Sequence, residues 1–136
     1  MDRGAVLARR ASKIPTELEL EILKILWRDG KSTVRHVRDE LALTRDLAHT
    51  TVITTMKVMI EKGYLERSKE EKKFLYSPTL PREEVEGKVV GDVVGRVFDG
   101  SPLALMLNIL DQAEIQKSDL DNLREYIEQK SREVGE

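Results

Sequence analysis

The order of local patterns along the chain is what limits its fold most. Apolar residues recur at the spacing of an amphipathic helix in three successive stretches, 16–29, 33–41 and 48–62. The pattern then changes, because 64–67 and 74–77 are rich in strand-favouring residues and enclose the wholly polar run 68–73. We therefore expect three helices followed by a β-hairpin with a charged tip.

Capping residues indicate where several helices begin and end. Thr16 is followed three residues later by Glu19, the pattern of a capping box. Gly63 directly follows the third stretch, and glycine is the residue that most often ends a helix. A second capping-box pattern, Ser118 with Asp121, predicts the start of the last helix.

The chain after Pro81 differs from the part before it in charge and in hydropathy. Residues 1–81 carry 16 Lys and Arg against 12 Asp and Glu, a net charge of +4, whereas 82–136 carry 7 against 13, a net charge of −6. Valines recur every four residues from 85 to 97, and 103–110 is apolar nearly all round. A tail of this size cannot bury such a segment on its own, so we expect a second chain to cover it.

Three helices followed by a hairpin is the order of a winged helix-turn-helix, in which the second and third helices read DNA and the hairpin is the wing. We expect a mainly α protein with a small β-hairpin. The predicted parts are a flexible basic arm over 1–15, a winged-helix DNA-binding domain over 16–80 and a helical domain over 81–136.

The third predicted helix has one apolar and one polar face. Advancing 100° per residue from Val52 places Met56, Met59 and Ile60 within about 100° of one another, which predicts the core face. The opposite side is rich in threonine, a modest helix former whose hydroxyl and methyl groups suit contacts with phosphates and base edges. The predicted major-groove residues are His49, Thr50, Thr51, Thr54 and Lys57. The alternative is a capped helix start with solvated threonines.

Cations beside this helix and on the wing are candidates for phosphate contacts. The set comprises Arg35, Arg38, Arg67, Lys69, Lys72 and Lys73. Glu70 and Glu71 oppose the charge of the wing tip, and a charged hairpin tip is also ordinary in proteins that bind nothing.

Catalytic and metal chemistry finds little support. The chain has no cysteine, which excludes a disulfide scaffold and thiolate metal sites, and its two histidines, His36 and His49, lack such partners. There is no glycine-rich phosphate loop; Gly87, Gly91 and Gly95 are spaced by four, which favours either close approach of another helix or a loosely packed helix. We expect no enzyme activity, metal or cofactor. No stretch is apolar enough for a signal sequence or membrane span, so we expect a cytoplasmic protein without membrane insertion.

Several local motifs resemble the penicillinase-repressor family, which includes beta-lactamase, methicillin-resistance and copper-responsive winged-helix repressors. The resemblance extends from about Thr16 to Lys130, and its most specific part is Thr-Thr-Val-x-Thr followed by Lys-Gly. The matching segments are 26–27, 33–37, 47–54, 61–65, 76–78 and 82–84.

The resemblance implies a homodimer that binds a palindromic operator in double-stranded DNA and represses transcription, with the C-terminal helices of two chains interlocked. The residues expected to make the dimer are Val89, Val93, Val97, Leu103, Leu105, Met106, Leu107, Leu110, Leu123 and Ile127. A hypothesis from a different class is a winged-helix module that binds other proteins and not DNA.

Two departures from the family pattern concern how repression is relieved. Copper-responsive members carry C-terminal cysteine pairs, which this chain lacks. Beta-lactam-responsive members are cut at an Asn–Phe bond, and our alignment places Asp92–Val93 at that position. The resemblance implies a membrane metalloprotease sensor as a partner, but the altered bond argues against cleavage there.

Overall fold

We analysed a computed structural model that describes residues 14–135. Apart from Ile14 and Pro15, the predicted basic arm lies outside the described residues. The chain divides into two compact units whose border lies between Asp92 and Val93. The predicted DNA-binding region, 16–80, falls entirely within the first unit.

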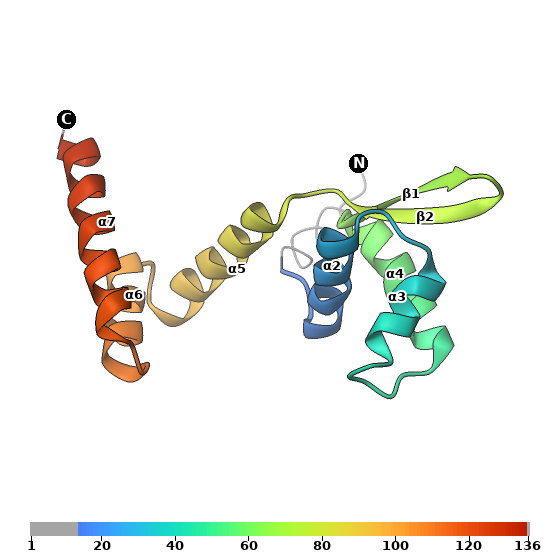
Figure 1. The fold of residues 1–136 in the computed structure, drawn as a ribbon, viewed down its shortest axis with the longest axis horizontal. Coiled ribbons are helices and arrows are strands. Elements are labelled where there is room, and N and C mark those ends of the chain that lie inside the picture. The colour runs from blue at the N-terminus through green and yellow to red at the C-terminus, as the bar shows by residue number, and fades with distance from the viewer. Residues whose placement is uncertain (1–13, 136) are drawn as a thin grey trace. The chain divides into compact units, whose positions relative to one another are not determined.

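The first unit has the predicted order of elements, three helices and then an antiparallel hairpin (Figure 1). Its elements are α2 (Glu17–Asp29), α3 (Val34–Leu41), α4 (His49–Lys62), β1 (Leu65–Glu70) and β2 (Lys73–Pro78). This arrangement confirms the predicted winged helix-turn-helix fold, with α3 and α4 as its two central helices and the hairpin as its wing.

The apolar faces of the three helices meet in one core. The most deeply buried large side chains are Ile22, Leu23, Leu26, Val37, Val52, Met56, Met59 and Val85. Val52, Met56 and Met59 are the predicted core face of α4, and Ile60 packs against the same core while partly exposed. Burial of this face sets which side of α4 is turned to solvent.

The predicted ends of α2 and α4 are confirmed. The Thr16 hydroxyl accepts a bond from the Glu19 amide (3.2 Å), and the Glu19 carboxylate accepts one from the Thr16 amide (2.8 Å). Gly63 ends α4 with φ of +89°, a left-handed conformation that suits glycine. Glu19 also binds the Lys62 ammonium (3.0 Å), so the start of α2 is joined to the end of α4.

The hairpin is longer than its sequence pattern suggested. The strands extend through most of the polar run and are joined by only two residues, Glu71 and Lys72. Both residues have positive φ, 49° and 68°, which is the backbone of a tight hairpin turn usually occupied by Asn-Gly. The tip was predicted to be broader because neither residue is a turn signal. At the base, Tyr76 exchanges backbone hydrogen bonds with Ser32 (2.8 and 3.0 Å).

Three further helices follow the wing. They are α5 (Arg82–Val97), which crosses the border between the units, then α6 (Pro102–Gln112) and α7 (Lys117–Gly135). The predicted cap at Ser118 is wrong, because α7 already begins at Lys117. Asp121 instead pairs with Lys117, 3.3 Å away and one turn earlier on the same helix.

The described helices were also compared with the requirements of a membrane span. No single helix among residues 14–135 is both long and apolar enough to cross a membrane. The α5–α6 pair reaches the length and composition only when both helices are taken together, and it is bent by 94°.

Candidate nucleic-acid interface

The exposed face of α4 carries the residues predicted to enter the major groove. Thr50, Thr51, Thr54 and Lys57 are all exposed, on the side opposite the buried Val52 and its neighbours. Within residues 14–135, the hydroxyls of these three threonines have no protein hydrogen-bond partner, so they are available to a ligand. The Thr55 hydroxyl differs, because it donates to the Thr51 carbonyl oxygen (2.7 Å) on its own helix.

Arg38 and His49, which were predicted separately, form one pair across the α3–α4 joint. A guanidinium nitrogen of Arg38 lies 2.8 Å from Nδ1 of His49. Because arginine only donates, Nδ1 accepts this bond and the ring proton of a neutral His49 is on Nε2. The pair therefore offers N–H donors from both helices at one place. Arg35, one turn earlier on α3, is exposed.

Arg45 holds the α3–α4 joint against α2. Its guanidinium binds Glu21 (2.5 Å) and Glu17 (3.3 Å), which lie one turn apart on the same side of α2. The sequence analysis did not identify this contact. The spacing of the two glutamates showed that they share a helix face, but not which cation would reach them. The contact fixes the start of α4 relative to the rest of the core.

His36, the other histidine, belongs to an ion-pair network between α2 and α3. Its Nε2 lies 2.7 Å from an Asp29 carboxylate oxygen, and Arg28 binds both Asp29 and Glu40. The hydrogen bond from Arg28, followed by that from His36, holds the pKa of Asp29 well below its ordinary value. The same contacts raise the pKa of Arg28. This network ties α2 to α3.

The wing separates its cations onto two faces. Arg67 and Lys69 share a face with Phe74, with the guanidinium carbon and the ammonium nitrogen 4.3 and 5.5 Å from the ring centroid. Lys73 lies on the other face, opposite Glu70 in the strand register. Glu70 is also paired with Lys31, so its charge opposes the wing lysines less than the sequence suggested. All four predicted wing cations, including Lys72 in the turn, are exposed.

A metal centre has no basis in the part of the chain that the structure describes. Among residues 14–135, no three His, Asp or Glu side chains gather in a way that could hold an ion.

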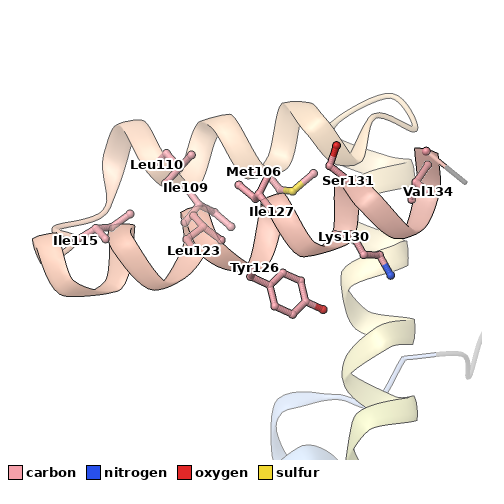
Figure 2. A pocket seen from close by; sticks show the side chains of 11 residues that line it. Met106, Ile109, Leu110, Ile115, Leu123, Tyr126, Ile127, Lys130, Ser131 and Val134 are labelled. Carbon is pink, nitrogen blue, oxygen red and sulfur yellow. The ribbon is translucent and has the colours of Figure 1, made fainter.

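The second unit exposes a large apolar surface. An open groove of about 900 Å³ lies between α6 and α7, and Figure 2 shows Met106, Ile109 and Leu110 of α6 with Leu123 and Ile127 of α7 along it. Of the predicted dimer residues, Val89, Val93 and Leu105 are partly buried. The others are exposed, namely Val97, Leu103, Met106, Leu107, Leu110, Leu123 and Ile127.

Comparison with known proteins adds a family and related regulators. A family model described as penicillinase repressor matches residues 15–129. The methicillin resistance regulatory protein MecI of Mammaliicoccus sciuri is 22% identical over 112 residues, covering 82% of this chain and 91% of MecI. The penicillinase repressor of Bacillus licheniformis is 25% identical over 119 residues, covering 86% and 93%.

One solved structure shares the fold over most of the chain. The transcriptional regulator Tm0710 of Thermotoga maritima matches with a TM-score of 0.50 at 22% identity, covering 89% of this chain and 80% of that one.

Proposed function

Because the chain belongs to the penicillinase repressor family, we propose that it is a transcriptional repressor that binds an inverted-repeat operator as a homodimer. The observation that carries the proposal is the exposed threonine–lysine face of α4, whose hydroxyls are left without protein partners in the described structure. A surface helix gains no stability from such residues, whereas a major groove offers partners for each of them.

The proposed roles follow from position. His49, Thr50, Thr51, Thr54 and Lys57 face the bases, where threonine methyl groups can meet thymine methyl groups and Lys57 can donate to guanine. Phosphate contacts come from Arg35, Arg38, Arg67, Lys69, Lys72 and Lys73. The Arg38–His49 pair suits a single phosphate beside the groove, because its donors come from two helices that meet there.

The homodimer is proposed from the apolar surface of α6 and α7. Large side chains such as Leu103, Met106 and Ile127 are more than half exposed, and water is a costly environment for so much apolar area. A two-fold pair of chains would cover this surface and place two α4 helices on two half-sites of a palindrome.

Binding to duplex DNA tests the proposal directly. The protein is titrated against its own promoter in gel-shift experiments at two salt concentrations, with Thr54→Ala/Lys57→Ala as the variant. We expect about 10- to 100-fold weaker binding for the variant. Each lost phosphate contact should also reduce the slope of log affinity against log salt by about 0.9.

Lys24→Ala is the matched control, because Lys24 is exposed on α2 and outside the proposed interface. An unchanged affinity in the double variant would refute the groove assignment. Failure of the wild-type protein to retard any duplex would favour the protein-binding module instead.

Regulated cleavage is proposed at Asp92–Val93, the bond at the border between the two units. A membrane metalloprotease sensor cutting there would separate the DNA-reading unit from the apolar surface and so remove the affinity that a second half-site supplies. The bond lies inside α5, so the helix must open locally before a protease can reach it. Mass spectrometry of fragments formed with the sensor identifies the cut, and intact α5 after induction would refute it.

Repression requires access to the chromosome, so the same proposal places the protein in the cytoplasm. It assigns no catalytic role to any residue.

A further inference from the structure

Phe74 is an exposed aromatic residue that the DNA-binding assignment does not use. It lies on β2 near the tip of the wing and is 45% exposed, beyond the part of the hairpin that packs on the core. An exposed phenylalanine contributes nothing to the core. Its position therefore calls for another role.

The surroundings of Phe74 are cationic on one face only. Lys69 is its direct partner in the strand register, and Arg67 lies two residues further along β1 on the same face. Their charged groups lie 5.5 and 4.3 Å from the ring centroid, within the range of a cation–π contact. Two long, flexible cations are thus held against one rigid ring.

We propose that Phe74 is a positioning residue for DNA binding, which holds Arg67 and Lys69 side by side so that the wing meets neighbouring phosphates with both charges already placed. This inference rests on the proposed DNA-binding function. Free lysine and arginine side chains lose rotamer freedom when they bind, and a ring that restricts them beforehand reduces that cost.

Lys73 provides a matched comparison within the same hairpin. It is a wing cation at a similar distance from the tip, but it lies on the opposite face, across from Glu70, and does not share the face of the ring. An effect of Phe74 that acts through cation–π contacts must reach Arg67 and Lys69 and leave Lys73 unaffected.

The experiment is a double-mutant cycle on operator affinity, measured over a range of salt concentrations. Phe74→Leu keeps an apolar side chain and removes the ring. We expect affinity to fall about fivefold and the salt slope to decrease by about one contact. Arg67→Met should cost less in the Phe74→Leu background than in the wild type, whereas Lys73→Met should cost the same in both. Phe74→Tyr, which restores a ring, should recover both affinity and slope.

A folding defect is recognised separately, because circular dichroism melting and Phe74→Tyr report on the hairpin without DNA. If the wild type binds its operator and Phe74→Leu changes neither affinity nor slope, or if Arg67 and Phe74 act additively, the positioning role is refuted while the DNA-binding proposal stands. If the wild type binds no duplex, both proposals are refuted.

Discussion

Glu19 connects two distant parts of the first unit. Its carboxylate closes the capping box with Thr16 and also binds Lys62 at the end of α4. The side chain is only 3% exposed, whereas that of Lys62 is 24% exposed. A buried charge with two partners is costly to remove, because each partner loses its hydrogen bond.

Glu19→Ala should therefore lower the free energy of unfolding by about 2–3 kcal/mol, measured by urea denaturation. Glu19→Gln keeps an acceptor for the Thr16 amide and should lose about 1 kcal/mol. Glu17→Ala is the control, since the Glu17 side chain is 88% exposed and its ion pair with Arg45 is a surface contact worth at most about 0.5 kcal/mol. Equal losses for Glu17 and Glu19 would contradict this account.

Tyr64 makes the stability of the first unit depend on alkaline pH. Burial, followed by the negative charge of Glu19, raises the pKa of Tyr64 to about 12. The unfolded chain releases this proton near pH 10, at lower pH than the folded chain, so stability should fall as pH rises from about 10 to about 12.

Titration of tyrosinate absorbance, with Tyr64→Phe as reference, should show one phenol ionising near pH 12 in the folded protein. Glu19→Gln should move that step to lower pH. Complete ionisation of all tyrosines by pH 10 in a folded sample would contradict the assignment.

Residue-level prediction from the sequence succeeded where one periodic pattern decides the outcome. The core face of α4 and the exposure of Thr50, Thr54 and Lys57 follow from the helical period alone. Contacts between elements, such as Arg38–His49, were not predictable, because they depend on how helices pack. Phe74 was interpreted only as a strand-favouring residue, since its cationic neighbours become visible only once the register is known.

At the scale of elements, the helices were predicted more accurately than the hairpin. Glycine and capping-box signals located the ends of α2 and α4, whereas the wing turn is formed by Glu71 and Lys72, which carry no such signal. Local sequence favours other conformations at these two positions, so pairing along the rest of the hairpin must impose the turn.

The glycines of α5 allow a test of the two interpretations left open by the sequence. A Cβ added at Gly91 meets nothing within 4 Å in the described structure. Gly91→Ala should therefore stabilise α5 by about 1 kcal/mol through helix propensity, seen as a higher melting temperature by circular dichroism.

Gly63→Ala is the matched control, because its surroundings are equally open but its φ is +89°. It should destabilise the protein by about 1 kcal/mol. A weaker dimer in Gly91→Ala would show instead that the glycine face meets another helix after assembly.

At the scale of the whole molecule, DNA binding depends on the proposed dimer. Ile127→Glu places a charge in the α6–α7 groove, where Ile127 is 54% exposed in the single chain. Burying that charge in an interface is prohibitive, so sedimentation should show monomers. Affinity for a two-half-site operator should fall about 100-fold or more, with little change for a single half-site.

Asn122→Glu adds the same charge to α7 at an exposed residue outside the groove lining and should leave the dimer intact. Monomers with both variants would point to general damage to α7, and dimers with Ile127→Glu would refute the assigned surface.

The anchoring of the wing at its base has a consequence for how such proteins diversify. Leu65 and Tyr76 are buried where the two strands meet the core, and Tyr76 is also bonded to Ser32. The faces of both strands are therefore set at the base, and the two-residue tip only closes the loop. Residues inserted at the tip should leave the Arg67–Phe74 face in place, so wing length can drift during evolution while that face is inherited unchanged.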